Sequence, residues 1–147
     1  MAYEGKWKDV FMFLSEAVKE QTQIRDYISG EAMIKGFLLA YLNITNSYIV
    51  NSEKELNKGV ADLWLEPIAI PNSEIRYSYL IELKYYKRSE EKEITNKLES
   101  IIKTATTQLK KYEKDAVIIQ EKAKTHVKKL ILVYNAWELI HLEEINF

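Results

Sequence analysis

The sequence predicts a mixed α/β (α+β) fold with elements in the order αα-βββ-α-ββ. Apolar residues first recur at helical spacing, then alternate as in strands, and a long helical segment separates the last two strands from the first three. No repeat or Pro/Gly-rich linker divides the chain. We therefore expect one domain over residues 1–147, with a helical lead-in at about 5–43 and a core at about 47–147.

Two helices are predicted in the lead-in. The segment Trp7–Glu20 places its apolar side chains on one stripe, and the segment Glu31–Leu42 is more apolar and is expected to be more buried. Gly30 before the second helix and Asn43 after it are residues typical of helix boundaries.

Five strands and one long helix are predicted in the core. Runs of aromatic and β-branched residues indicate strands, and Asn57-Lys58-Gly59, Pro71-Asn72-Ser73 and Asn135-Ala136-Trp137 have compositions typical of connections between them. The helix is expected at Glu90–Asp115. The strands are expected at Tyr48–Glu55, Val60–Glu66, Tyr77–Tyr86, Val127–Tyr134 and Glu138–Ile145.

Composition excludes several classes of protein. The absence of cysteine excludes disulfides, thiol catalysis and thiolate metal sites, and it favours a reducing cytoplasm. The longest apolar run, Phe37–Leu42, is far shorter than the roughly 20 residues of a membrane span. With His126 and His141 as the two histidines, a zinc site is not expected. We expect a cytoplasmic protein without a membrane partner.

Charge is unevenly distributed although the net charge is only −1. Residues 84–129 contain twelve lysines and one arginine against seven acidic residues. Such a segment can meet a phosphate backbone, but a solvated lysine-rich helix face explains it equally well. Charge alone leaves both interpretations open.

A candidate site arises from the register of one predicted hairpin. If the strands around Pro71-Asn72-Ser73 pair about Asn72, Asp62 lies opposite Glu82, where like charges repel. Alternation places Glu82 and Lys84 on one face of the sheet. Two carboxylates forced together need a proton or a cation, and Mg²⁺ is commonly held by one or two carboxylates.

Plainer interpretations of the same residues remain. Asp62 fits a residue that caps a turn, and Glu82 and Lys84 fit the wet face of an amphipathic strand. The apolar character of their strand and the pairing of two acids favour a site. Gln108 lies on the inward stripe of the long helix, where it could orient a site group or only bond the backbone.

These residues resemble a known family. The segments 55–67 and 79–85, which carry Asp62, Glu82 and Lys84, are similar to the motifs of the PD-(D/E)XK nuclease superfamily. More narrowly, the chain resembles the nuclease-type domain at the C-terminus of bacterial AAA-ATPase-like proteins of Bacteroidetes. The segments 25–42, 108–112 and 135–139 extend this resemblance over nearly the whole chain. The proline of the family name is replaced here by Ala61.

The resemblance implies a restriction-endonuclease-like core with one mixed sheet and a catalytic site. Asp62 and Glu82 would hold Mg²⁺ or Mn²⁺, with the Leu83 backbone carbonyl completing the shell. Lys84 would position or help deprotonate the attacking water and stabilise charge at the phosphate, and Gln108 corresponds to an accessory glutamine. The further acids of the family pattern are Glu31 and Glu55.

Two functions follow from the resemblance. The first is a divalent-metal-dependent nuclease domain acting on nucleic acid, DNA more than RNA. The alternative is a catalytically silent module that binds nucleic acid or a partner and regulates an AAA-type ATPase in cis or in trans. The chain contains no G-x-x-x-x-G-K-[ST] phosphate loop of its own. A homo-oligomer is left open.

Overall fold

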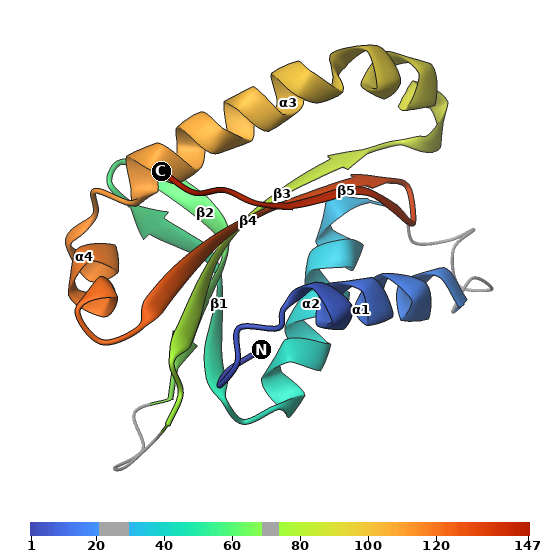
Figure 1. The fold of residues 1–147 in the computed structure, drawn as a ribbon. Coiled ribbons are helices and arrows are strands. Elements are labelled where there is room, and N and C mark those ends of the chain that lie inside the picture. Colours follow the sequence, from blue (N-terminus) through green and yellow to red (C-terminus); the bar gives the residue numbers. More distant parts are fainter. Residues whose placement is uncertain (21–29, 69–73) are drawn as a thin grey trace.

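The protein is described here from a computed structural model that covers residues 1–20, 30–68 and 74–147 (Figure 1). It is the expected mixed α+β domain, with one five-stranded sheet and helices on both sides of it. The helices are α1 (Lys8–Glu20), α2 (Glu31–Ile44), the 3-10 turn η2 (Arg88–Glu90), α3 (Glu91–Tyr112) and α4 (Ala116–Lys122). The strands are β1 (Tyr48–Leu56), β2 (Gly59–Pro67), β3 (Tyr77–Tyr86), β4 (His126–Asn135) and β5 (Glu138–Glu144).

The sheet is mixed, and its strands follow one another in the order β1-β2-β3-β4-β5. The first three strands form the predicted antiparallel meander, and β5 pairs antiparallel with β4. Only β3 and β4 run parallel, because α3 and α4 carry the chain back across the sheet between them. This single mixed sheet is consistent with the expected restriction-endonuclease-like core.

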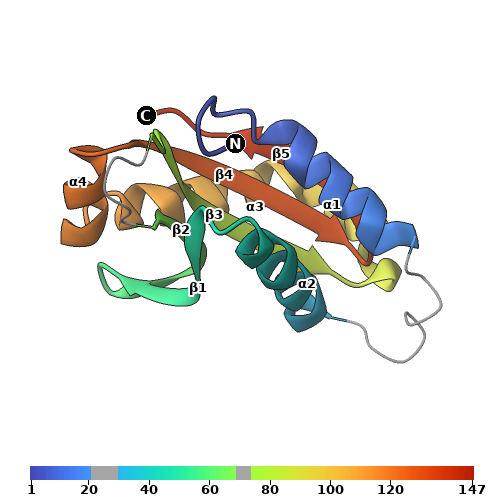
Figure 2. The same ribbon diagram turned by 90° about the horizontal axis from the view of Figure 1, so that it is seen from below.

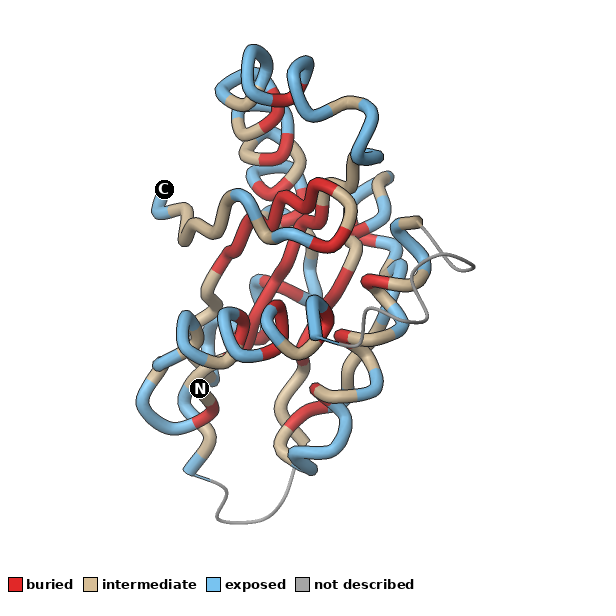
Figure 3. Tube along the Cα trace, turned by 90° about the vertical axis from the view of Figure 1, so that its right-hand side faces the viewer, coloured by how far each residue is buried: buried red, intermediate tan, exposed pale blue. Residues whose placement is uncertain are grey.

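Three layers enclose two apolar cores. On one face α1 and α2 pack against Leu63, Ile81 and Leu132, and on the other face α3 and α4 pack against Trp64, Leu80 and Val133 (Figures 1 and 2). The middle of the sheet, formed by β3 and β4, is the most completely buried part of the chain (Figure 3). Strands covered on both faces read as near-continuous apolar runs, and β3 and β4 do so. Charged residues within them are therefore exceptions to explain.

The predicted elements are confirmed, with shifts of at most two residues at their ends, except in one region. The predicted helix Glu90–Asp115 ends at Tyr112, and a separate helix, α4, follows it. Asp115 causes the break because its side chain caps α4 by accepting a hydrogen bond from the Val117 N–H (2.9 Å). The sequence prediction missed α4. The predicted turn at residues 71–73 lies outside the described residues.

The β1–β2 turn is fastened to the C-terminal end of α3. Asn57 and Lys58 both have positive φ (43° and 62°), as a tight two-residue hairpin turn requires. Lys111 Nζ donates to the Lys58 carbonyl (2.8 Å), and the Tyr112 hydroxyl donates to the Val60 carbonyl (2.8 Å). These contacts fix the start of β2 relative to α3.

No helix among residues 1–20, 30–68 and 74–147 has the length and apolar character needed to cross a membrane.

The fastened turn makes a prediction about Gly59. A Cβ at this position would lie 2.6 Å from the Tyr112 ring, so Gly59→Ala must displace Tyr112 and should destabilise the fold by about 1–3 kcal/mol. The matched control is Gly36→Ala, because nothing lies within 4 Å of a Cβ at that helical position. The control should stabilise the fold by about 0.5–1 kcal/mol. Urea denaturation of both variants measures the difference, and equal stabilities would contradict the proposed packing.

Candidate active site

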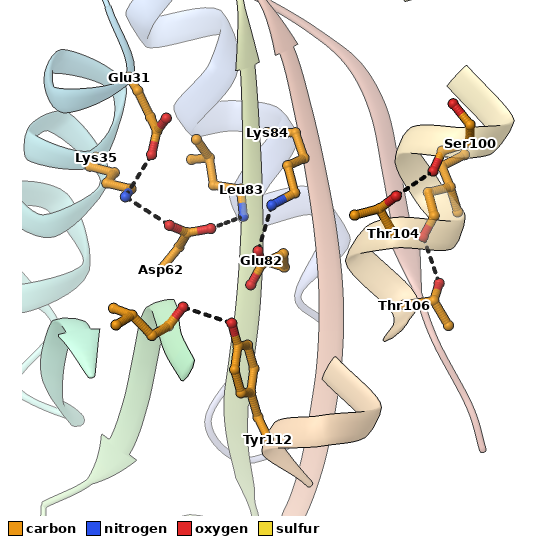
Figure 4. A network of polar contacts seen from close by, with 12 residues as sticks. Glu31, Lys35, Asp62, Glu82, Leu83, Lys84, Ser100, Thr104, Thr106 and Tyr112 are labelled. Atoms are coloured by element: carbon orange, nitrogen blue, oxygen red, sulfur yellow. Dashed lines mark hydrogen bonds and ion pairs between the residues drawn. The ribbon is translucent and has the colours of Figure 1, made fainter. Parts of the chain in front are cut away.

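The candidate site forms where β2 and β3 separate. The two strands pair at Leu63–Ile81, Trp64–Leu80 and Leu65–Tyr79, which is the predicted register. This ladder ends just before Asp62 and Glu82. The Asp62 carboxylate takes the place of the missing backbone partner, because its Oδ2 accepts a hydrogen bond from the Leu83 N–H at 2.8 Å (Figure 4). Asp62 thus contacts β3 through its side chain at the point where the backbones of the two strands no longer pair.

An irregularity in β1 accompanies this gap. The β1–β2 ladder is continuous in register on both sides of Asp62 but lacks a pair at Glu53 and Asp62. Glu53 has a positive φ of 54°, a left-handed conformation that non-glycine residues seldom adopt. Such local strain is often found at functional sites. Here the positive φ of Glu53 lies directly opposite Asp62, at the one position where the β1–β2 ladder lacks a pair.

Glu82 is a buried carboxyl in the middle of the sheet. Its Oε1 accepts a hydrogen bond from Lys84 Nζ at 2.6 Å, while its Oε2 is buried without a hydrogen-bond partner. Burial raises the pKa of Glu82 to about 7; Lys84 opposes the rise, and the Asp62 carboxylate adds to it. A buried oxygen without a partner is costly, so this atom marks a place where a cation or a water would be held.

Lys84 lies on the same face of β3 as Glu82, as the alternation of the strand predicted. Its side chain is about one quarter exposed (23%), whereas that of Glu82 is almost completely covered (2%). Lys84 also lines a pocket of about 470 Å³ between the end of β3 and α3. Lys84 therefore contacts the buried Glu82 carboxylate and also borders the pocket.

Lys35 is a site residue that the sequence interpretation missed. From α2 its Nζ binds Asp62 Oδ1 (2.7 Å) and Glu31 Oε1 (2.7 Å; Figure 4). The same Nζ lies 3.8 Å from Glu53 Oε1. Burial opposes its charge, but the hydrogen bonds with Asp62 and Glu31 outweigh this and raise the pKa of Lys35. Lys35 stays protonated and holds the Asp62 carboxylate in place. Its helical position, one turn after Glu31, was the available signal.

The backbone of Leu83 faces the site. Within an extended strand, the N–H and C=O of one residue point toward the same neighbouring strand. Because the Leu83 N–H points to Asp62, its carbonyl is directed to the same side of β3. The predicted use of this carbonyl as a metal ligand is compatible with this orientation.

Gln108 faces inward from α3, as the helical stripe predicted. It is partly buried, and its Oε1 is enclosed without a hydrogen-bond partner. Burial raises the pKa of the neighbouring Tyr112 phenol, and the Glu82 carboxylate raises it further. Tyr112 therefore lies within the electrostatic range of the site. Three buried side-chain atoms in the described parts of the chain lack a partner, and two of them belong to Glu82 and Gln108.

The two accessory acids differ in position. Glu31 reaches Asp62 indirectly, because both carboxylates bind Lys35. Glu55 is exposed on β1 opposite Val60. The acid of β1 that approaches the cluster is Glu53, two residues earlier.

The donor set suits a hard divalent cation. In residues 1–20, 30–68 and 74–147, no three Asp, Glu or His side chains are grouped so as to enclose a metal ion. Mg²⁺ does not need such a cage, because one or two carboxylates with waters and substrate phosphate usually suffice. Asp62, the unpartnered Glu82 Oε2 and the Leu83 carbonyl provide oxygen ligands of this kind. Lys35 binds Asp62 Oδ1, the Leu83 N–H binds Asp62 Oδ2, and Lys84 binds Glu82 Oε1. A carboxylate oxygen has two lone pairs, so each can still accept a second partner.

Fold and site together define an α+β domain with an Asp…Glu-x-Lys set at the parting of two strands. A family model for the PD-(D/E)XK nuclease superfamily matches residues 29–144. The chain belongs to this superfamily, whose members are generally nucleases and typically use divalent metals. Searches of curated proteins and of solved structures found no match.

The buried carboxyl predicts how stability depends on pH. Glu82 binds its proton more tightly in the folded chain (pKa about 7) than in the unfolded chain (4.5), so its contribution to stability is lost as pH rises from 4.5 through 7. Glu82→Gln is neutral at every pH and should reduce this loss by an amount on the order of 3 kcal/mol.

Urea denaturation in EDTA at about pH 4.5 and about pH 8 measures this change. Glu16→Gln, at an exposed position of α1, is the control and should behave as the wild type. An equal loss of stability in wild type and Glu82→Gln would show that Glu82 is not a desolvated carboxyl.

Proposed function

We propose that this chain is a divalent-metal-dependent nuclease domain that hydrolyses phosphodiester bonds of nucleic acid, DNA more than RNA. One observation carries the proposal: Asp62, the buried and half-unpartnered Glu82, and Lys84 converge where β2 and β3 separate. An ordinary amphipathic strand would not bury a carboxylate oxygen without a partner. Membership of the superfamily supports the same chemistry.

Asp62, Glu82 and the Leu83 carbonyl are the groups that would hold Mg²⁺ or Mn²⁺. A bound divalent ion supplies a nucleophile at neutral pH and neutralises charge on the phosphoryl group. Glu82 offers its unpartnered Oε2, and Asp62 is held in a fixed orientation by Leu83 and Lys35. Fixed orientation matters because small displacements of ligands are costly in catalysis.

Lys84 and Gln108 complete the proposed machinery. Lys84 is tethered to Glu82 and borders the pocket, so its ammonium can stabilise negative charge on the phosphate and position the attacking water. Gln108 presents a carbonyl oxygen without a protein partner, which suits accepting a hydrogen bond from that water. The lysine-rich segment 84–129 would attract the phosphate backbone.

A second function is favoured by the ion pairs of the site. Lys35 and Lys84 each form an ion pair with one of the carboxylates, so the protein itself supplies cations to the cluster. A catalytically silent module that binds nucleic acid or a partner would use the fold in this way. Such a module would regulate an AAA-type ATPase in cis or in trans, and the resemblance to ATPase-associated domains supports this partner.

Metal binding should be visible as stabilisation of the folded chain. Mg²⁺ or Mn²⁺ binds the folded state only, so the melting temperature should rise with metal concentration. At a metal concentration of one hundred times the dissociation constant, the free energy of unfolding should increase by about 2.7 kcal/mol. Asp62→Ala should abolish the rise, whereas Lys84→Ala should retain it because Lys84 is not a ligand. Calorimetry or thermal fluorescence measures this. A wild type that does not respond to metal has no such site.

Cleavage tests the nuclease proposal directly. Labelled single- and double-stranded DNA and RNA are incubated with the protein in Mg²⁺, Mn²⁺ or EDTA. Asp62→Ala and Lys84→Ala should each reduce cleavage by about a hundredfold or more, because the first removes a proposed ligand of the metal and the second removes a cation beside the reacting phosphate. Lys8→Ala, an exposed lysine of α1, is the matched control and should cleave normally.

The two proposed functions give different outcomes. Full cleavage by Lys84→Ala would remove the role given to this lysine. Metal binding without cleavage of any substrate would favour the silent module over the nuclease.

A further inference from the structure

The pocket beside Lys84 has a specific relation to the candidate site. Lys84 and Tyr86 line it from β3, on the strand face that also carries Glu82. Ile94, Lys97, Ile101 and Thr104 line it from α3, and Gln108 follows one turn after Thr104 on the same side of the helix. The pocket therefore continues the site along one face of β3 and one face of α3.

Size and lining suit a small amphipathic group. Its volume of about 470 Å³ falls in the range of pockets that bind small organic ligands. Ile94 and Ile101 are buried apolar residues, and the partly buried Tyr86 adds an aromatic ring. A flat heterocycle needs such apolar and aromatic contacts for its faces.

Polar groups remain available among the lining residues. Ser100 and Thr104 donate their hydroxyl protons to the carbonyls of Lys97 and Ser100 (2.8 and 2.9 Å; Figure 4 shows both side chains on α3). The lone pairs of these hydroxyls are left to accept hydrogen bonds from a ligand. These two hydroxyls can therefore accept hydrogen bonds from the N–H groups of a base or the hydroxyls of a sugar.

The charges of the pocket cancel. Among the lining residues, the positive charges of Lys84 and Lys97 balance the negative charges of Glu90 and Glu93, and Lys84 is also bound to Glu82. An additional phosphate inside the pocket would gain little attraction, whereas a neutral nucleoside would be accepted. Lys84, which lines the pocket, is the group already assigned to the scissile phosphate.

We propose that this pocket binds one unstacked nucleoside next to the scissile phosphate, and that the substrate is therefore single-stranded nucleic acid. This proposal rests on the proposed nuclease function for the assignment of Lys84. A base within a continuous duplex is stacked on both faces and cannot enter a pocket between a helix and a strand without being extruded. A single strand or a frayed end offers such a base without that cost.

A binding experiment tests the pocket without cleavage. Thymidine 5′-monophosphate is titrated into isotope-labelled wild-type protein in EDTA, and amide chemical shifts are followed by NMR. The expected result is a saturable change confined to the β3 end and α3, with Ile101 and Thr104 among the affected amides. No change there, or changes only elsewhere, would overturn the proposal even if the protein cleaves nucleic acid.

A pair of variants tests the substrate class. Thr104→Trp places a large ring in the pocket, whereas Thr107→Trp places the same ring on an exposed position of α3 outside it. Thr104→Trp should bind and cleave a single-stranded oligonucleotide about tenfold less well, the effect of losing one stacked base, and Thr107→Trp should match the wild type. Melting temperatures of both variants confirm folding. Equal cleavage by the two variants would overturn the proposal that this pocket binds a nucleoside of the substrate.

Closed circular duplex provides the remaining comparison. The wild type should cleave a single strand at least about tenfold faster than this duplex, which has no frayed ends. Equal rates would overturn the single-strand inference while leaving the nuclease function intact. If no substrate is cleaved at all, the nuclease proposal fails, and the NMR titration alone decides whether the pocket binds a nucleotide.

Discussion

The site depends on a backbone hydrogen bond that the sheet does not complete itself. Where β2 leaves β3, the Leu83 N–H would lack a partner inside the protein, and a buried donor of this kind is costly. Asp62 supplies the acceptor at 2.8 Å and is fixed at the edge of β3. The same separation leaves room beside Glu82, whose second carboxylate oxygen has no protein partner. The point at which β2 and β3 stop pairing is therefore also the point at which the two acids come together.

Lysines balance this concentration of acids from two directions. Lys35 comes from α2 on one side of the sheet, and Lys84 comes from β3 itself. Pairs of this kind offset the cost of burying charge, but they also compete with any cation for the same oxygens. No lysine binds Glu82 Oε2, so this oxygen can bind a cation without displacing a lysine. A pKa near neutrality then makes its protonation, and hence its affinity for a cation, sensitive to small changes in the surroundings.

Local patterns in the sequence were sufficient for the strands, the long helix and the register that aligns Asp62 with Glu82. Period, turn residues and alternation are local signals, and they were enough because the meander is built from local contacts. Lys35 could not be assigned in this way, since its contact with Asp62 depends on how α2 packs on the sheet. The positive φ of Glu53 likewise follows from tertiary structure rather than from residue type. The helix α4 was missed because Asp115, read as a helix end, also begins the next helix.

The parallel pairing of β3 with β4 has a consequence for how the chain folds. Ser78 bonds Thr125, 47 residues later, whereas β1, β2 and β3 are neighbours in sequence. Closing such a long segment costs chain entropy before any contact is gained, so we expect the crossover to close after the meander has formed. We expect Glu82 to remain in contact with water, and to ionise as an ordinary carboxyl, until α3 covers the sheet. The cost of desolvating the carboxylate is therefore deferred to the last stage of folding, after the surrounding sheet is already in place.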